Sequence, residues 1–332
     1  MRIDVHAHYW PKSYIDVMVE EGRPDAARAA QPDDLDARLA EMDSVGVERQ
    51  YFSAIGLNTV MPTASGSVRA ARHLNDLYVD IRERTGGRMD GYATITLPFV
   101  DEAIAEAKRA LEDLHLVGIA LPCYIDGRTL DADEFEPLWA YLDTQKAVVY
   151  VHPSGSDSAN VAGLADFGLN MLLGSTMQVA MTPLRLGIRG VTTRYPNVRF
   201  IFAVMGGTLP YLWERFETNL IRGLKAVEAA GPNVPPFFSW MKGGSFTVED
   251  PMRVFRSSFY YDTSVQDIPA SLGLARTSVG IDHVLLGSDA TFASLTEAVH
   301  LVEGTPDLTA EEKTAILDEN AERLFRSAGV LA

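Results

Sequence analysis

Short apolar runs alternate along the chain with longer segments in which apolar residues recur every three or four positions. The first pattern is typical of buried strands, and the second is typical of amphipathic helices that pack against them. Eight runs are predicted to be strands, at residues 2–8, 47–53, 90–95, 117–121, 147–151, 198–204, 259–262 and 283–286. Eight strands alternating with helices predict an α/β fold with a parallel sheet, and this number favours closure into a (β/α)8 TIM barrel.

Helical periodicity is clearest in the segments that separate these runs. It predicts helices over residues 65–85, 101–114, 133–145, 294–303 and 309–326. An earlier helix is expected to begin at Pro32-Asp-Asp-Leu-Asp36, where acidic residues favour a helix N-terminus, and to stop at Gly46. Residues 232–250 are rich in Pro, Gly and aromatic residues, which predicts an irregular excursion between strands six and seven that distorts the barrel. Without an internal repeat or a linker, residues 1–332 are expected to form a single domain.

The amino-acid composition indicates which classes of partner and which cellular compartment to expect. The 29 basic and 45 acidic residues give a formal charge of −16, and no Lys/Arg cluster is present that would neutralise phosphates, so nucleic acid is not expected as a partner. No apolar run reaches 18 residues, and the first residues lack the basic-then-apolar pattern of a signal peptide, so no membrane association is expected. Cys123 is the single cysteine, which excludes an intrachain disulfide and fits a reducing, cytoplasmic location.

Three histidines and one aspartate lie at the carboxyl ends of three of the predicted strands. His6 and His8 end the first strand on one face, His152 ends the fifth, and Asp289 follows the eighth. In a (β/α)8 barrel the carboxyl ends of the strands meet at the catalytic rim. Three imidazoles and a carboxylate suit Zn²⁺ best, with Mn²⁺, Fe²⁺ or Co²⁺ as alternatives, and leave a position for water or substrate. The alternative is a hydrogen-bonded rim histidine at 152 and a helix-capping or turn aspartate at 289.

The order of short motifs resembles the amidohydrolase superfamily, in the amidohydrolase-related branch that contains aminocarboxymuconate semialdehyde decarboxylase and metal-dependent aromatic acid decarboxylases. The resemblance covers essentially the whole chain. It rests on Ile3-Asp-Val-His-Ala-His8, Met42-Asp-Ser-Val-Gly-Val47, Val149-Tyr-Val-His-Pro153, Arg194-Tyr-Pro-Asn197, Gly206-Gly-Thr-Leu-Pro-Tyr211, Tyr260-Tyr-Asp-Thr263, Leu286-Gly-Ser-Asp289 and Asn320-Ala-Glu-Arg-Leu-Phe325.

The resemblance implies one catalytic divalent metal, held by His6, His8, His152 and Asp289. Such an ion would bind carboxylate or hydroxyl groups of a small carboxylic acid substrate and polarise a water or a carbonyl group. The resemblance also implies a homodimer, in which an arginine eleven positions after the strand-six histidine reaches the neighbouring active site to bind the substrate carboxylate. Arg215 occupies that offset here, counted from Val204. A surface arginine in a salt bridge is the alternative for this residue.

Val204 is the main departure from the family pattern, because relatives usually carry histidine before the paired glycines of strand six. Valine cannot move a proton, and a positioned acid/base group contributes roughly 10²–10⁴ in rate. Three explanations stay open. The chemistry does not need activated water; the proton comes from Asp289, Asp262 or the substrate; or the chain is an inactive variant. For Asp262, at the end of strand seven, a structural hydrogen-bonding role is the alternative. An apolar Val204 would also form a pocket wall, with Trp10 and Phe292 as expected aromatic contacts at the pocket mouth. Packing in the core is the alternative for both aromatic residues.

These observations predict a metal-dependent decarboxylase, a carbon–carbon lyase, that acts on a small aromatic or unsaturated carboxylic acid. Three alternatives remain at this point. They are a metal-dependent hydrolase of a lactone, amide or ester, a lyase of the hydratase or cyclase type, and a catalytically impaired homologue that binds metal or ligand without turnover.

Overall fold

Eight strands form one sheet in which all neighbours run parallel and follow the order of the chain. The computed structural model describes residues 1–29, 34–57, 60–154, 163–164, 166–241, 246–265 and 268–331. The strands are β1 Ile3–His8, β2 Arg49–Ser53, β3 Met89–Ala93, β4 Gly118–Pro122, β7 Val148–His152, β8 Arg199–Phe202, β9 Phe259–Asp262 and β10 Val284–Leu285. The amide of Val5 donates to the carbonyl oxygen of Leu286 at 2.9 Å, which joins β1 to the segment after β10 and confirms the predicted barrel.

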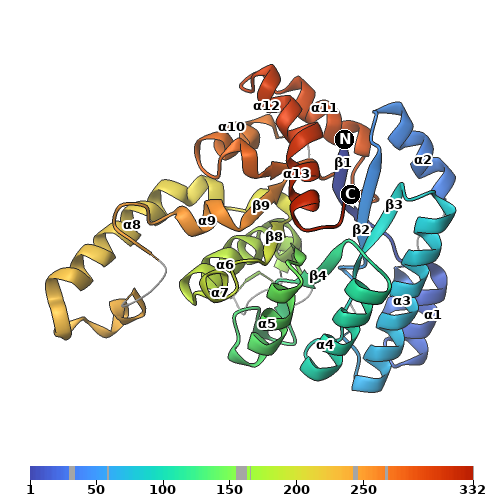
Figure 1. Cartoon of the computed structure of the whole chain (residues 1–332), viewed down its shortest axis with the longest axis horizontal. Coiled ribbons are helices and arrows are strands. Elements are labelled where there is room, and N and C mark those ends of the chain that lie inside the picture. Colours follow the sequence, from blue (N-terminus) through green and yellow to red (C-terminus); the bar gives the residue numbers. More distant parts are fainter. Residues whose placement is uncertain are drawn as a thin grey trace.

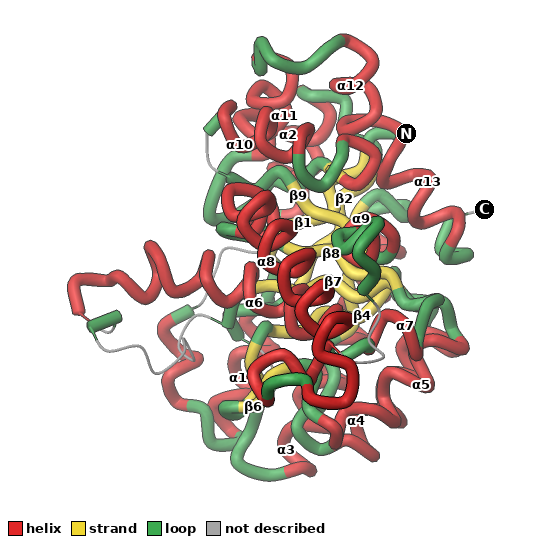
Figure 2. The backbone as a smooth tube through the Cα atoms, turned by 90° about the vertical axis from the view of Figure 1, so that its left-hand side faces the viewer, coloured by secondary structure: helices red, strands yellow, loops and turns green. Residues whose placement is uncertain are grey.

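Helices surround these strands, as the tube in Figure 2 shows. They are α1 Lys12–Glu20, α2 Leu35–Ser44, α3 Ala64–Arg84, α4 Val100–Lys108, α5 Glu136–Thr144, α6 Ser175–Ile188, α7 Val191–Arg194, α8 Leu209–Ala230, α9 Arg253–Ser257, α10 Pro269–Thr277, α11 Leu295–Gly304, α12 Ala310–Thr314 and α13 Asn320–Ser327. π-Helical segments extend α4, at Arg109–Asp113, and join α12 to α13, at Ala315–Glu319. The helices predicted over 101–114 and 309–326 are therefore present, each with a wider turn inside it.

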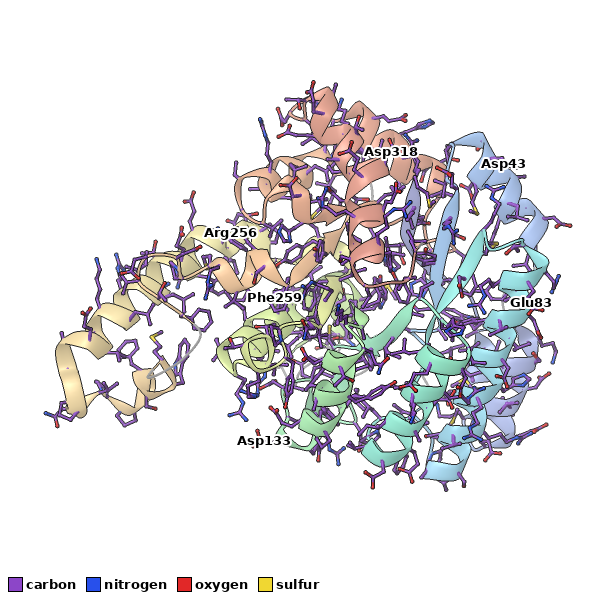
Figure 3. The ribbon with its side chains drawn as sticks, viewed as in Figure 1. Asp43, Glu83, Asp133, Arg256, Phe259 and Asp318 are labelled. Carbon is purple, nitrogen blue, oxygen red and sulfur yellow. The ribbon has the colours of Figure 1, made fainter. Side chains whose placement is uncertain are left out.

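Local sequence explains where the long helix α3 begins and which face it buries. The side chain of Thr63 accepts a hydrogen bond from the amide of Gly66, which satisfies one of the free donors at the helix start. Leu74, Tyr78 and Ile81 follow at helical spacing and are buried. Across the molecule, the same spacing of apolar and charged residues turns apolar side chains toward the interior and charged side chains toward the solvent. In Figure 3, Phe259 lies in the interior while Asp43, Glu83, Asp133 and Asp318 lie at the periphery.

Some elements were not predicted or differ from the prediction. Helix α1 occupies a segment that was expected to be a loop, and a two-stranded antiparallel sheet, β5 Tyr124–Ile125 with β6 Arg128–Thr129, follows β4. Helix α2 starts at Leu35 with Asp34 as its cap, so Pro32 and Asp33 of the predicted helix start lie outside the described residues.

Helix α8 and the segment after it extend away from the barrel (Figure 1). The predicted excursion over residues 232–250 contains short 3-10 turns, at Gly231–Asn233 and Pro236–Met241, and its residues 242–245 lie outside the described part. Among the described helices, none combines the length and the apolar character needed to span a bilayer.

Asp90 on β3 provides a test of the core that is independent of function. Burial raises the pKa of its carboxyl group to about 6, against the opposing effect of Arg82. The folded protein therefore holds this proton over a pH range, from about 4 to 6, in which the unfolded chain has released it, so the contribution of Asp90 to stability falls as pH rises through that range.

We expect Asp90→Asn to remove this dependence. The difference in free energy of unfolding, variant minus original protein, should rise on the order of 2 kcal/mol between pH 4 and pH 6. Loss of the contact with Arg82 would shift this difference by the same amount at every pH. Urea denaturation of both proteins across this range measures the difference. Parallel stability curves would show that Asp90 does not titrate in this way.

Candidate metal centre

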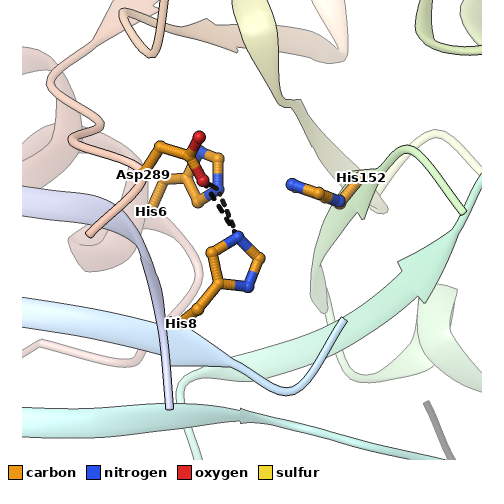
Figure 4. A group of neighbouring side chains, drawn as sticks. All are labelled: His6, His8, His152 and Asp289. Carbon is orange, nitrogen blue, oxygen red and sulfur yellow. Dashed lines mark hydrogen bonds and ion pairs between the residues drawn. The ribbon is translucent and has the colours of Figure 1, made fainter. Parts of the chain in front are cut away.

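Four side chains from distant parts of the sequence converge where the barrel strands end. His6 and His8 lie in the second half of β1, His152 is the last residue of β7, and Asp289 follows β10. One possible ligand atom from each of the four lies within 4.8 Å of the others. Figure 4 shows His152 approaching from the side opposite His6, His8 and Asp289. The structure thus brings together the four residues that the sequence predicted as a ligand set.

The contacts within the group involve the atoms that a cation would use. Asp289 Oδ1 lies 3.0 Å from His8 Nε2 and 3.2 Å from His6 Nε2, and these two nitrogens are 3.2 Å apart. His152 Nδ1 lies 2.9 Å from the carbonyl oxygen of Pro153, where it can donate as a neutral ring and leave Nε2 with a lone pair. Three imidazole nitrogens and a carboxylate oxygen at this spacing are a donor set that fits one divalent transition metal ion.

Burial and the neighbouring charges set the protonation states in this group. Burial lowers the pKa of His8 and lowers the pKa of His152 well below its usual value, so both rings are neutral at neutral pH. Burial also lowers the pKa of His6, but the carboxylates of Asp262 and Asp289 outweigh it and raise this pKa to about 10. The pKa of Asp289 is raised by burial and lowered more strongly by His6 and His8, so the carboxylate is ionised. An ionised Asp289 and neutral rings at His8 and His152 match what metal binding requires of ligands, whereas His6 carries a proton in the metal-free site and would release it when a metal binds.

Asp262 at the end of β9 lies behind His6. Its side chain is fully buried, and its Oδ2 lies 2.9 Å from His6 Nδ1, the ring nitrogen that faces away from the ligand cluster. The hydroxyl of Tyr150 donates to the same oxygen at 3.2 Å, and Ser264 Oγ donates to Oδ1 at 2.6 Å. A carboxylate in this place orients a ligating histidine and sets its tautomer. The sequence offered a catalytic role and a structural hydrogen-bonding role for Asp262, and the structure places its buried carboxylate against His6.

Close approach of backbone segments positions Asp289 and Asp262. A Cβ on Gly287 would lie 2.7 Å from the Cβ of Asp262 and 3.0 Å from the Cβ of His6, so a side chain at Gly287 would push these elements apart. Next to it, Ser288 donates from its amide and its hydroxyl to the two carboxylate oxygens of Asp4, at 2.9 and 2.6 Å. These contacts tie the segment that carries Asp289 to β1.

Val204 lies beyond the end of β8, in a tight 3-10 turn over Val204–Gly206, although the sequence predicted it as the last residue of strand six. Its φ is +53°, which β-branched residues rarely adopt, and Met205 follows with φ +52°. The amide of Val204 donates to Asp262 Oδ1 at 3.0 Å, which compensates part of this strain. Position 207, three residues after Val204, requires glycine, because a Cβ on Gly207 would overlap the carbonyl of Thr176. Val204 therefore supplies an apolar side chain and a backbone donor, and no proton-transfer group.

The other predicted contact residues lie in different settings. The rings of Trp10 and Phe292 both pack on His8, with centroids 5.6 and 5.0 Å from its ring. Trp10 is buried, whereas Phe292 is 61% exposed and lies on the outer side of the cluster. Arg215 is exposed on α8, one turn after the exposed Tyr211. Contact of these residues with a substrate stays a prediction.

Sequence reasoning missed the residues that support the cluster from behind. Tyr150, Ser264, Ser288 and Asp4 make the hydrogen bonds described above, and none was singled out. Tyr150 lies two residues before His152 on β7, so strand alternation places both side chains on the same face, and this signal could have identified it. For Asp4, alternation would have misled, because the pairing of β1 with β2 shifts register between Asp4 and Ala7.

Comparison with known proteins finds similar sequences over nearly the whole chain. The model of the amidohydrolase family matches residues 3–327. The decarboxylase yanB of Aspergillus niger is 28% identical, over 98% of this chain and 87% of its own length. The 6-methylsalicylic acid decarboxylase acuB of Aspergillus aculeatus is 26% identical, over 98% of this chain and 96% of its own.

Solved structures share the fold at lower identity. The 5-carboxyvanillate decarboxylase of Novosphingobium aromaticivorans, complexed with manganese and a nitrobenzoic acid, superposes with a TM-score of 0.81 at 20% identity, covering 98% of this chain and 96% of its own. The 2,6-dihydroxybenzoate decarboxylase from Rhizobium gives a TM-score of 0.78 at 21% identity, covering 98% of each chain.

Proposed function

The chain belongs to the amidohydrolase family, and from this premise we propose that it is a metal-dependent decarboxylase of a small aromatic carboxylic acid that carries a hydroxyl group. The observation that carries the proposal is the convergence of His6, His8, His152 and Asp289 within 4.8 Å. The relatives described above, which match nearly the whole chain and are named as decarboxylases, support the reaction type.

These four residues would hold the metal, and the ion would supply a Lewis acid that binds and orients the carboxylate and hydroxyl oxygens of the substrate. The manganese in the structure of the 5-carboxyvanillate decarboxylase supports a divalent transition metal, with Mn²⁺ and Zn²⁺ both compatible with the donor set. A cytoplasmic location stays a prediction, consistent with the free thiol of Cys123, whose pKa burial raises to about 12.

Asp289 is the proposed proton-transfer group. Its side chain is 15% exposed, whereas that of Asp262 is fully buried, so of the two carboxylates Asp289 is the one that a substrate can reach. Because it is ionised, it first accepts the proton of the substrate hydroxyl and then donates it to the ring carbon that bears the carboxylate. The bonding electron pair of the departing carboxylate restores the aromatic ring as CO₂ leaves, and the phenolate product takes a proton from water.

This route explains how the reaction can proceed with valine at position 204. It does not require water to be activated as a nucleophile, so the proton-transfer group that valine lacks is not needed at that place. Hydrolysis of an ester, amide or lactone does require such activation, and the same residue therefore disfavours the hydrolase alternative.

Detection of CO₂ tests the proposal directly. The manganese-loaded protein is incubated with 2-hydroxybenzoate, 2,6-dihydroxybenzoate and 2-hydroxy-6-methylbenzoate, with metal-stripped protein as the control. We expect CO₂ and the corresponding phenol only from the loaded protein. Hydrolysis of lactones or esters without CO₂ release would favour a hydrolase instead, and ligand binding without any turnover would favour an impaired homologue.

We further propose a homodimer that uses the apolar surface beside the barrel mouth. Phe167, Met171, Leu172 and Tyr211 are between 72% and 95% exposed, and an apolar group of this size on a protein surface favours an interface. Light scattering should give twice the chain mass, and Leu172→Glu should give a monomer. Leu274→Glu, at a 41% exposed leucine on α10, is the matched control and should stay dimeric. A monomeric original protein would contradict the proposal.

A further inference from the structure

Asp4 on β1 is a buried carboxylate that the proposed reaction does not use. Its side chain is fully buried, and among the described residues it forms no ion pair. Neutral donors hold it instead, from the amide of His6, the amide and hydroxyl of Ser288 and the side chain of Gln50. Burial of a charge without an opposite charge costs stability, so stability alone does not account for an aspartate at this place.

The two oxygens of this carboxylate join segments that carry two of the four ligands. Oδ1 accepts from the amide of His6 at 3.1 Å and from the amide of Ser288 at 2.9 Å. Oδ2 accepts from the hydroxyl of Ser288 at 2.6 Å and from Gln50 Nε2 at 2.9 Å. His6 is itself in the ligand cluster, and Ser288 directly precedes Asp289. Because every neighbour donates, only a group that accepts at both oxygens, an ionised carboxylate, fits this place.

Gln50 and Arg38 extend these contacts to a third ligand. Gln50 pairs with Asp4 across β1 and β2 and is buried. Its Nε2 donates to Asp4, so its Oε1 is left for Arg38, whose Nη1 lies 3.5 Å away. The Nη2 of Arg38 donates to the carbonyl oxygen of His8 at 2.7 Å. The side-chain amide of Gln50 therefore has one orientation that satisfies both neighbours, with its donor toward Asp4 and its acceptor toward Arg38.

We propose that Asp4 is a positioning residue that holds three of the four ligands in the arrangement that binds the metal. The inference rests on the metal site of the function proposed above. Asp4 is outside the ligand cluster and acts on it through hydrogen bonds to the segments that carry the ligands. Loss of a group that orients ligands in this way typically reduces metal affinity by roughly 10–100-fold.

Replacement of Asp4 with asparagine tests this role with little change in size. An amide accepts at one oxygen only, so in Asp4→Asn its NH₂ group faces other donors. Gln50 can turn its oxygen toward position 4 only by turning its own NH₂ group toward the guanidinium of Arg38.

We expect Asp4→Asn to bind Mn²⁺ about 10-fold or more weakly, by calorimetry on metal-stripped protein. The visible absorption spectrum of the Co²⁺-loaded variant should also differ from that of the original protein, because the spectrum reports the arrangement of the ligands. An unchanged Mn²⁺ dissociation constant or an unchanged Co²⁺ spectrum would overturn the inference.

A compensating substitution separates positioning from general damage. In Asp4→Asn/Gln50→Glu the carboxylate moves from β1 to β2, where it accepts from the new amide and from Arg38. The hydroxyl of Ser288 can then donate to the carbonyl oxygen of His6, which lies 3.1 Å away. The double variant should recover most of the lost Mn²⁺ affinity, whereas Gln50→Glu alone sets two carboxylates against each other and should lower it. Additive losses would contradict the proposal.

Asp90→Asn is the matched control. Asp90 is also a buried carboxylate on a strand, 5% exposed, but its hydrogen bonds come from Arg82 and from the amide of Gly91. Both variants should change the free energy of unfolding, and only Asp4→Asn should change Mn²⁺ affinity. Equal loss of affinity in both variants would reduce Asp4 to a general structural role.

Ser288→Ala keeps the inference testable if Asp4→Asn does not fold. It removes the hydroxyl that donates to Asp4 and leaves the amide bond in place. Its Mn²⁺ affinity should fall by a smaller factor than that of Asp4→Asn, and an unchanged affinity would again overturn the inference.

Measurement of metal affinity also separates this inference from the proposed reaction. Weaker Mn²⁺ binding by Asp4→Asn, without CO₂ release by the original protein, would retain the positioning role and refute the decarboxylase. Release of CO₂ by the original protein, with unchanged Mn²⁺ affinity in Asp4→Asn, would do the reverse. An original protein that binds no Mn²⁺ would refute both.

Discussion

Replacement of Asp289 with alanine is expected to abolish both metal retention and decarboxylation. The residue contributes the carboxylate oxygen that lies within 3.2 Å of both His6 and His8, and its loss leaves the Nε2 atoms of these two buried imidazoles facing each other without a carboxylate, while His6 keeps Asp262 on its other ring nitrogen. Even loss of a residue that supports a ligand costs 10–100-fold in metal affinity, so loss of a ligand should exceed about 100-fold. Elemental analysis after gel filtration and CO₂ release measure the two effects.

A second substitution separates the two roles of this carboxylate. Asp289→Asn keeps an oxygen at the same place but cannot accept a proton, so the variant loaded with excess metal should bind substrate while kcat falls by roughly 10²–10⁴. Asp282→Ala, at an exposed acidic residue, is the matched control and should behave as the original protein. Full metal occupancy together with full activity in Asp289→Ala would exclude Asp289 from both roles.

The second large effect is expected from Asp262→Asn. An amide at this position no longer carries the charge that holds His6 at 2.9 Å, so affinity for manganese should fall by about 10–100-fold. If Asp262 acts through His6, saturating manganese should restore kcat to within a few-fold of the original value. Titration of activity and of bound metal against manganese concentration distinguishes affinity from turnover.

Tyr150→Phe serves as the graded comparison for this prediction. It removes one hydrogen bond to Asp262, at 3.2 Å, and leaves the bond from Ser264 in place, so the loss of metal affinity should be smaller than for Asp262→Asn. A kcat that stays 100-fold or more below the original at saturating metal in Asp262→Asn would mean that Asp262 itself transfers the proton, as the sequence first suggested.

The sequence predicted which four side chains meet at the rim, because this convergence is local or follows from the fold class. Alternation along a strand places His6 and His8 on one face, and the rule that barrel strands end at a common rim brings His152 and Asp289 to the same place. Neither inference requires knowledge of the distance between two residues in the folded chain. The order of the eight barrel strands followed from periodicity for the same reason, since burial of one face acts on residues that are close in sequence.

Other features depended on contacts between segments far apart in the chain, and no sequence pattern indicates that these segments meet. Helix α1 was not predicted, because it follows Pro11 directly and its periodic segment is only nine residues long. The placement of Asp262 behind His6 depends on Gly287, whose missing side chain lets β9 and β1 approach. No pattern around position 262 distinguishes a supporting carboxylate from one that faces the substrate.

Sequence alone therefore determined the order of the eight barrel strands, the barrel class and the residue types gathered at its rim, because each follows from the periodicity of burial along a strand or a helix. Only the tertiary structure decided which carboxylate is partly exposed and which lies behind a histidine, and that Val204 occupies a left-handed turn. These features depend on the distances between strands and loops that are not adjacent in the sequence. The whole fold sets those distances, and no single segment does.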